Sequence, residues 1–500
     1  MKVTIKMPPG YSMEELKEES RKALGTDQFY ILKRSLDARR KSHIHYLVTV
    51  SDIPYESIAA PKYVESSERP VVIGGGPCGL FAALWLSLSG LRPILIERGA
   101  PAQERQGYIH ELMVHRFLNP ENNISFGIGG AGAFSDGKLN TGTNSPYHRY
   151  ILETMVSCGA PEEILYEAKP HIGSDKLPGM LSAIVDRIIS LGGEVRCHSK
   201  FKEFIFKNNK IVGVVYENKK QKMTIDTHQV ILAVGHSARD TFSYLYHEAN
   251  IPMMQKNFAV GLRIEHLQEI INFAQYGNIK GLPSADYKLV VHGPADVYSF
   301  CMCPGGTVVP AMHEWRTVCT NGMSVYQRDG KNANAAIVTP VTQKDFESDS
   351  PLAGMEFQRR IEETAYKMAG HNYNAPTCSV GSFLKKNNAS MIEPTYRPGV
   401  TECDLWNLYP ERITKALQFG ICAMEQKIHG FSNDHAALTG PETRTSSPIR
   451  IPRDENGRSE LIGLFPAGEG SGWAGGILSA AADGIRQAEN VISFIKELSL

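Results

Sequence analysis

The sequence predicts an α/β protein built around a parallel sheet, and three observations support this fold class. Strand and helix signals alternate from Pro70 to about Arg239, as they do when helices connect parallel strands. Glycine-rich turns recur far apart in the chain, at 74–79, 127–132 and 468–476. A chain of 500 residues is also too long for a single compact core, so we expect two or three domains.

The composition restricts the class of partner and the compartment. Fifty-three basic residues balance 53 acidic ones, so no overall charge favours nucleic acid or anionic lipid. Nine cysteines, an odd and mostly scattered set, argue against a secreted disulfide framework. The first residues lack the apolar core of a signal peptide, and the most apolar helical stretch, 79–90, is shorter than the roughly 20 residues that span a bilayer. We therefore expect a soluble cytoplasmic protein with no membrane partner, and the balanced charge argues against a nucleic-acid partner without excluding a local basic patch.

Residues 1–53 predict a small α+β unit of β-α-β-β order. A strand at 3–7 ends at two prolines, and Ser12 and Glu15 then have the spacing of a capping box. The helix that follows ends at Gly25, and β-rich runs occupy 29–32 and 43–50. A unit of this size must dock on the rest of the protein to be stable. Residues 54–70, with three prolines, predict a linker.

The remaining chain predicts a discontinuous domain with another domain inserted into it. We assign 71–245 to the first part of a nucleotide-binding domain, 246–454 to an inserted mixed α+β domain for the substrate, and 455–500 to the last part of the first domain. The inserted region is rich in Gly, Pro and short β-runs, and a last apolar helix spans 475–498.

The first glycine-rich turn has the pattern of a dinucleotide-binding site. Gly74, Gly76 and Gly79 form G-x-G-x-x-G between an apolar strand and a helix-forming run that begins at Pro77. The glycines allow a tight turn, close approach of a diphosphate and close packing of the helix, whose free amides attract phosphate. A second strand ends at Glu97, where a carboxylate accepts hydrogen bonds from ribose hydroxyls. These features predict a Rossmann-type domain.

Three later segments favour FAD over NAD. The loop 126–138 contains a second G-x-G-x-x-G but lacks a good strand before it, which favours a loop that contacts flavin. The strand 229–235 ends in Ala-x-Gly, as strands beside flavin often do. The segment 461–484 resembles a flavin motif in which a strand ends in Gly-Glu and the next helix points at the ring. We therefore predict one FAD, held non-covalently.

The predicted cofactor-binding residues come from these four segments and from the residues next to them. They are Gly74, Gly76, Pro77, Cys78, Gly79, Glu97, Arg98, Gly129, Gly130, Ala131, Gly132, Phe201, Ala233, Gly235, Gly468, Glu469, Gly475, Gly476 and Ile477.

Several further segments resemble those of a largely uncharacterised family of FAD-dependent dehydrogenase-like proteins. They begin at Ser35, Lys169, Gly235, Tyr298, Glu442 and Gly468, and the resemblance covers nearly the whole chain. It implies an FAD domain of the glutathione-reductase type, discontinuous in sequence, with a second domain inserted between its strands. It implies no particular substrate.

The candidate catalytic residues each follow a segment that is expected to end at the cofactor. They are Lys138, His236 and Arg239, where a cation would stabilise reduced flavin. The alternative role for each is a hydrogen bond to a phosphate or to the backbone. His171, Asp175, Arg263, His266 and Arg444 are further candidates because they lie in the family-like segments. Cys301-x-Cys303 lacks a second pair of ligands for zinc, so we expect buried free thiols and no metal site.

The sequence leaves three functions open. The first is an FAD-dependent dehydrogenase or reductase of a small molecule. Only one dinucleotide domain is evident, so hydride would come from transiently docked NAD(P)H, from the substrate or from a protein donor. The second is a flavin-dependent monooxygenase. The third, of another class, is an FAD-stabilised module in which the basic N-terminal unit binds RNA or protein. The sequence does not indicate an oligomeric state.

Overall fold

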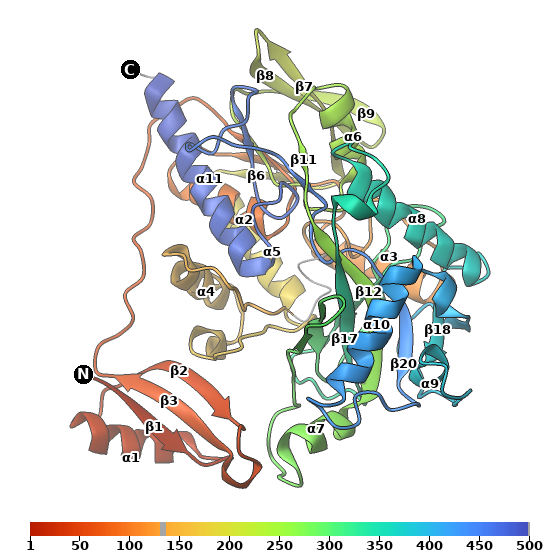
Figure 1. Ribbon diagram of the computed structural model, residues 1–500. Coiled ribbons are helices and arrows are strands. Elements are labelled where there is room, and N and C mark those ends of the chain that lie inside the picture. The colour runs from red at the N-terminus through yellow and green to blue at the C-terminus, as the bar shows by residue number, and fades with distance from the viewer. Residues whose placement is uncertain (131–136, 499–500) are drawn as a thin grey trace.

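The computed structural model describes residues 1–130 and 137–498. It consists of a small N-terminal unit, a parallel sheet flanked by helices, and a second domain built on a larger mixed sheet. Figure 1 shows the N-terminal unit at the lower left, joined to the rest by a long extended segment.

The N-terminal unit has the predicted β-α-β-β order. Its elements are β1 (Lys2–Met7), α1 (Met13–Leu24), β2 (Tyr30–Asp37) and β3 (His45–Ser51), with sheet order β1-β3-β2 and antiparallel pairing. The capping box is confirmed, because the Glu15 amide donates to Ser12 Oγ at 3.2 Å and the Ser12 amide donates to the Glu15 carboxylate at 2.7 Å. Gly25 ends the helix with φ +75°.

The N-terminal unit docks on the main body through the edge strand β2. The Arg34 amide donates to the Tyr166 carbonyl at 2.6 Å, and the Ala168 amide donates to the Arg34 carbonyl at 2.8 Å. The Arg34 guanidinium pairs with Glu167. Ile44, just before β3, is buried in the core of the second domain. The small unit therefore gains backbone pairing and apolar burial that its own core does not supply.

The nucleotide-binding domain is built on a five-stranded parallel sheet, which confirms the predicted fold class. Its order is β22-β10-β4-β5-β6, and every pairing is parallel. The strands are β4 (Val71–Ile73), β5 (Ile94–Ile96), β6 (Glu194–Arg196), β10 (Val230–Leu232) and β22 (Leu464–Pro466). Because β22 comes from the last forty residues, the sheet is discontinuous in sequence.

Helices and a second small sheet cover the two faces of the parallel sheet. On one face α2, α5 and α11 share a core that includes Leu84, Ile184 and Ile485, and Figure 1 shows α11 beside α2. On the other face α6 and the antiparallel sheet β7-β8-β9 share a core that includes Phe204 and Leu245. The elements are α2 (Pro77–Leu88), α3 (Ala102–His115), α4 (Tyr147–Ser157), α5 (Leu177–Ser190), β7 (Ser199–Lys207), β8 (Lys210–Asn218), β9 (Gln221–Asp226), α6 (Arg239–His247) and α11 (Ile477–Leu498).

The second domain is built on a seven-stranded mixed sheet of order β13-β14-β17-β12-β20-β18-β19. Its long central pair, β12 and β17, is antiparallel, whereas β18 and β19 are parallel. The strands are β12 (Phe258–Leu267), β13 (Val290–Val291), β14 (Val297–Cys303), β17 (Asn332–Val341), β18 (Ala375–Ser379), β19 (Val400–Glu402) and β20 (Ala437–Glu442), with helices α7 (Gln268–Tyr276), α8 (Ala353–Met368), α9 (Val380–Phe383) and α10 (Glu411–Met424). The expected mixed α+β character is confirmed.

Short elements complete the described part of the chain. Two-stranded pairs join β11 (Met254–Gln255) to β21 (Ile449–Arg450) and β15 (Thr307–Pro310) to β16 (Thr320–Met323). The 3₁₀ turns are η1 (Lys41–His43), η2 (Glu162–Leu165), η3 (Gln343–Asp345) and η4 (Leu405–Asn407). Among the residues described, no helix has both the length and the apolar character needed to cross a bilayer.

Candidate functional site

A cavity of about 530 Å³ lies at the carboxyl ends of the parallel strands. The residues that directly follow four of these strands, Gly74, Glu97, Ala233 and Ala467, all line it. Residues 299–303 of β14 in the second domain form another part of its wall. Open parallel sheets bind ligands at this end of their strands, so this cavity is the candidate site.

The first glycine-rich turn is shaped by two contacts that exclude a side chain. Gly74 has φ +104°, and a Cβ there would lie 2.3 Å from the Ala233 carbonyl oxygen. A Cβ on Gly79 would lie 1.8 Å from the Gly74 carbonyl oxygen. These glycines allow the tight turn and the close approach of α2 to the strands. Gly79 itself does not line the cavity, contrary to its prediction as a cofactor-binding residue, because it packs against the Gly74 carbonyl.

Other glycines of the cavity face open space. A Cβ built on Gly76, Gly235, Gly475 or Gly476 would meet no atom within 4 Å, although all four residues line the cavity. Gly76 is the N-cap of α2, and no side chain caps that helix end. Exposed amides at a helix N-terminus, with bare backbone beside them, fit a bound diphosphate. The bare backbone at 475–476 likewise leaves room for a ring at the start of α11.

Glu97 fixes the glycine-rich turn from the end of β5. Its buried carboxylate accepts hydrogen bonds from the Gly75 amide at 2.7 Å and the Gly99 amide at 2.8 Å. Arg105, also fully buried, lies 3.4 Å from it. A Cβ on Gly127 would lie 1.8 Å from this carboxylate. Glu97 lines the cavity. Its Oε1 accepts from both Gly99 and Arg105, whereas Oε2 accepts from Gly75 and keeps a lone pair for a further donor such as a ribose hydroxyl.

Arg98 and Phe201 also line the cavity, next to Glu97. The Arg98 guanidinium binds both carboxylate oxygens of Asp240, at 3.1 and 2.5 Å, and stacks over the Phe126 ring at 4.3 Å from its centroid. Arg98 is therefore held rigidly where it reaches the cavity.

Pro77, Cys78 and the predicted residues of the C-terminal segment line the same cavity. The latter are Gly468, Glu469, Gly475, Gly476 and Ile477. Cys78 is buried, and burial raises the pKa of its thiol well above the usual range. It therefore stays neutral.

The candidate catalytic residue His236 pairs with a predicted cofactor residue. Its Nδ1 lies 3.3 Å from Glu469 Oε1, and both side chains line the cavity with about a quarter of their surface exposed. The carboxylate orients the imidazole, so that Nε2 is the nitrogen left to meet a ligand.

The loop at 126–138 reaches the cavity, but fewer of its predicted residues line the cavity than expected. Ser125, Phe126, Gly127, Gly137 and Lys138 line it. Gly129 and Gly130 do not: a Cβ on Gly129 would lie 2.6 Å from Ala102, and one on Gly130 would lie 1.7 Å from the Phe126 carbonyl oxygen. These two glycines let the loop pack on itself and on α3. Ala131 and Gly132 lie outside the described residues.

Arg239 does not line the cavity, contrary to the expectation for a catalytic residue. It begins α6, and its buried guanidinium binds the Glu362 carboxylate at 3.0 Å through each terminal nitrogen. Arg444, which does line the cavity, binds the same carboxylate at 2.7 Å. Burial alone would raise the pKa of Glu362, but Arg239 and Arg444 lower it to about 2. Arg239 thus links α6 to α8.

The other residues of the family-like segments serve structural contacts. Arg263 is fully buried and binds the Glu442 carboxylate at 2.6 and 2.9 Å. His266 contacts the Phe431 carbonyl at 2.8 Å, and burial lowers its pKa to about 4. His171 and Asp175 bind the backbone of Tyr326. None of these four lines the cavity.

Several cavity residues carried no signal in the sequence. Asp286, Tyr287 and Lys288, together with Asn321 and Asn140, all line the wall. Asp286, Tyr287, Lys288 and Asn321 lie in segments without a motif, and only long-range packing of the second domain brings them to the cavity. Asn140 follows the loop at 126–138, whose pattern ends before it.

The Cys301-x-Cys303 pair also lines the cavity. Neither cysteine forms a disulfide with another cysteine of the described residues. Cys303 is buried as expected, whereas Cys301 is exposed, contrary to the prediction. The difference arises from a β-bulge between Phe300 and Cys303, where Cys301 has φ +42°. A bulge redirects the side chain of the extra residue.

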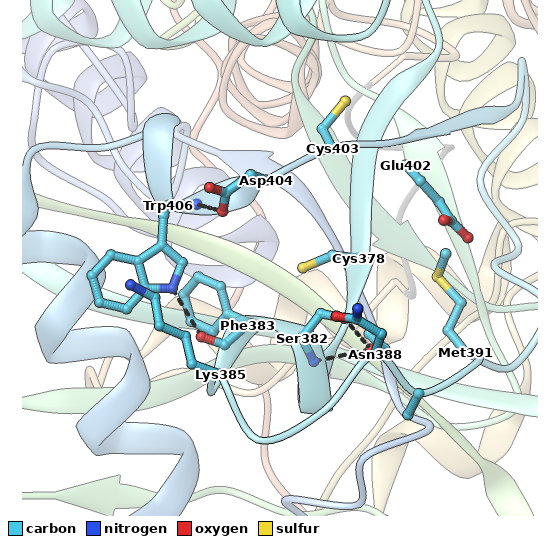
Figure 2. Close-up of a pocket in the computed structure, with 12 residues that line it drawn as sticks. Cys378, Ser382, Phe383, Lys385, Asn388, Met391, Glu402, Cys403, Asp404 and Trp406 are labelled. Carbon is cyan, nitrogen blue, oxygen red and sulfur yellow. Dashed lines mark hydrogen bonds between the residues drawn. The ribbon is translucent and has the colours of Figure 1, made fainter.

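A separate cavity of about 470 Å³ lies beside β18 and β19 in the second domain. Figure 2 shows its wall, with the Lys385 side chain lying against the Trp406 ring, Cys378 on β18 and Cys403 directly after β19. No described residue lines both cavities. The second cavity lacks the glycine-rich backbone of the first.

The parallel sheet and its glycine-lined cavity define the chain as a protein of the Rossmann-type dinucleotide-binding class. Residues 257–445 match a family model described as FAD-dependent protein, C-terminal domain-like, and residues 1–51 match a domain of unknown function. An uncharacterised protein of Clostridium beijerinckii is 42% identical over 493 residues, covering 92% of each chain. The chain therefore belongs to this family of FAD-dependent proteins, and its cofactor is FAD.

Two solved structures are similar over most of this chain. One is a glycerol-3-phosphate dehydrogenase from Bacillus halodurans complexed with FAD, 13% identical, with TM-score 0.35, covering 87% of this chain and 66% of that one. The other is a geranylgeranyl bacteriochlorophyll reductase-like protein from Thermoplasma acidophilum, 12% identical, with TM-score 0.38, covering 86% of this chain and 79% of that one.

Proposed function

We propose that the protein is an FAD-dependent oxidoreductase, a dehydrogenase or reductase that acts on a small molecule. The observation that supports this best is one continuous cavity whose wall joins the glycine-rich turn at 74–79 to the polar residues of β14 and of 286–288. A cofactor bound at the glycine-rich turn would face a ligand bound by the residues of the second domain. Bound FAD supplies the centre that accepts and gives up hydride.

In this proposal the chain binds the two ends of FAD with different elements. Gly76 and the N-terminus of α2 hold the diphosphate, and Glu97 accepts hydrogen bonds from the adenosine ribose. Gly468, Glu469 and the residues that precede α11 hold the ribityl chain and the ring. The positive end of the α11 dipole stabilises negative charge on a ligand at its N-terminus.

His236 and Lys138 are the proposed catalytic residues. His236, oriented by Glu469, holds or moves a proton at Nε2. Lys138 places an ammonium group at the wall that joins the two parts of the cavity. The described residues contain a single glycine-rich turn followed by a dinucleotide-type helix, so we propose that NAD(P)H docks transiently or that a protein donates electrons.

The cofactor part of the proposal is tested with Gly76→Val. Gly76 has ordinary extended φ and an open space where its Cβ would project, so the variant should fold normally. The valine side chain would occupy the space of the diphosphate, and we expect the purified protein to lose most of its flavin absorbance. Wild-type far-UV circular dichroism with retained yellow colour would place the diphosphate elsewhere.

The reaction type is tested on purified wild-type holoprotein. Anaerobic mixing with NADH or NADPH should bleach the 450 nm band, and an organic acceptor should restore it. Oxygen consumption coupled to NADPH turnover only in the presence of a substrate would favour a monooxygenase. A flavin that neither these donors nor reduced ferredoxin can bleach would contradict the oxidoreductase proposal and favour a binding module.

A further inference from the structure

One ion pair joins the two large domains at the solvent-exposed edge of the cavity. Lys169 lies between α4 and α5 of the nucleotide-binding domain, and Asp286 lies just before β13 of the second domain. Lys169 Nζ binds both Asp286 oxygens at 2.8 Å, and both residues line the cavity. Their side chains keep 63% and 34% of their surface exposed. The pair therefore lies where the cavity opens to solvent, which we call the cavity mouth.

The N-terminal unit contacts the chain next to Lys169. The Arg34 amide in β2 donates to the Tyr166 carbonyl at 2.6 Å, and the Ala168 amide donates to the Arg34 carbonyl at 2.8 Å. The Arg34 guanidinium also lies 5.5 Å from the centroid of the Tyr166 ring. These contacts end one residue before Lys169, so they fix the backbone from which its side chain extends.

The same unit contacts the element that supports Asp286. Ile44, just before β3, belongs to the same apolar core as Ile271 and Tyr276 of α7. Gln275, also of α7, donates from Nε2 to the Asp286 carbonyl at 3.2 Å. The N-terminal unit is thus in contact with the segments that carry both partners of the ion pair, although neither partner belongs to it.

We propose that the Lys169–Asp286 pair closes the cavity mouth, and that the N-terminal unit holds the two partners together. An exposed ion pair is weak because water solvates both charges, so it can open when a ligand enters and form again behind it. The contacts of the N-terminal unit keep the two backbones in place meanwhile. This inference rests on the proposed function, because it assigns control of substrate entry to the N-terminal unit.

The test measures how fast a neutral reagent, N-ethylmaleimide, labels Cys301 in purified holoprotein, with mass spectrometry to locate the label. Cys301 is exposed and lines the cavity, whereas Cys422 is exposed on α10 outside it and is the internal reference. Lys169→Glu and Asp286→Lys each place like charges opposite each other. We expect each to speed Cys301 labelling at least threefold relative to Cys422, and the double exchange to restore the wild-type rate.

Lys280→Glu is the matched control, because Lys280 is exposed and does not line the cavity. It should leave the labelling of Cys301 at the wild-type rate. Wild-type rates in both single variants, or fast labelling that the double exchange does not slow, would overturn the closing role of the pair.

Two further variants test the N-terminal unit at its two contacts. Arg34→Ala and Ile44→Ala should each speed the labelling of Cys301 at least twofold at wild-type flavin content, whereas Lys33→Ala, an exposed neighbour, should not. Wild-type rates in both variants would overturn the role of the N-terminal unit. Labelling needs no turnover, so these outcomes are separate from a flavin that no donor bleaches, which would contradict the proposed function instead.

Discussion

At the scale of single residues, Glu97 has two roles: it is a predicted contact of the cofactor, and it holds the backbone of the glycine-rich turn. Its two oxygens accept separate backbone amides, from Gly75 and Gly99, and its charge lies next to the buried Arg105. Removing the carboxylate altogether leaves a buried guanidinium unpaired, which costs about 3–5 kcal/mol. The Glu97→Ala variant would therefore not distinguish loss of the cofactor from loss of the fold.

Glu97→Gln is the better test. Glutamine keeps the shape but has one oxygen for two amides, so one amide loses its acceptor and the turn loosens. We expect FAD to bind roughly 10- to 100-fold more weakly, about 1–3 kcal/mol, as measured by flavin fluorescence titration of apoprotein. Glu104→Gln, an exposed change on α3, is the control. Equal FAD affinity in the two variants would contradict the role of Glu97.

His266 predicts how stability depends on pH. Its folded-state pKa is about 4, below the roughly 6.5 of an unfolded chain. Between these values the unfolded state binds the extra proton, so stability falls as pH decreases from 6.5 to 4, by up to about 1.4 kcal/mol per unit. Urea unfolding at pH 7, 5.5 and 4.5 should show this slope, and His266→Gln should reduce it. If the free energy of unfolding of the variant has the same dependence on pH, that dependence comes from other groups.

At the scale of elements, the pairing of α2 with α11 positions both helix N-termini at the cavity. A Cβ on Gly484 of α11 would lie 2.1 Å from the Cys78 carbonyl oxygen of α2. The two helices therefore pack through backbone, and any side chain at 484 forces them apart.

Gly484→Ala should displace α2 and α11 together. We expect a loss of about 1–3 kcal/mol in the free energy of unfolding and a lower flavin content, measured by denaturant titration and absorbance. Gly107→Ala in α3 is the matched control, because its Cβ meets no atom within 4 Å, and it should gain about 0.4–1 kcal/mol. Similar effects of the two changes would show that the α2–α11 contact is not tight.

At the scale of the whole molecule, the N-terminal unit is held by the contact between β2 and residues 166–168. Arg34→Ala removes the ion pair with Glu167. We expect faster cleavage by trypsin within residues 54–70, followed by mass spectrometry, with unchanged flavin content. Lys33→Ala, an exposed neighbour, should leave the rate unchanged. Equal cleavage rates for the two variants would mean that the unit is held by other contacts.

The sequence predicted those parts of the site that depend on local geometry. The turn at 74–78, the strand end at Glu97 and the bare glycines before α11 follow from short-range steric rules, and the structure places them all at one cavity. The prediction that Arg239 is catalytic was wrong because its partner, Glu362, lies more than a hundred residues away on α8. Arg444 was a candidate from its family-like segment, and it does line the cavity. Tyr287 reaches the wall only through the folding of the second domain, and no pattern within a few residues of it indicates that.

The position of β22 has a consequence for how the protein is made. The ribosome releases the chain from its first residue onward, and β4, β5, β6 and β10 emerge long before Leu464–Pro466 and α11. Until then β10 has no partner on its outer edge, and the face of α2 that packs on α11 is uncovered. The cavity is therefore complete only after residues 464–498 have been made, and chains that stop before them expose apolar surface to chaperones and proteases.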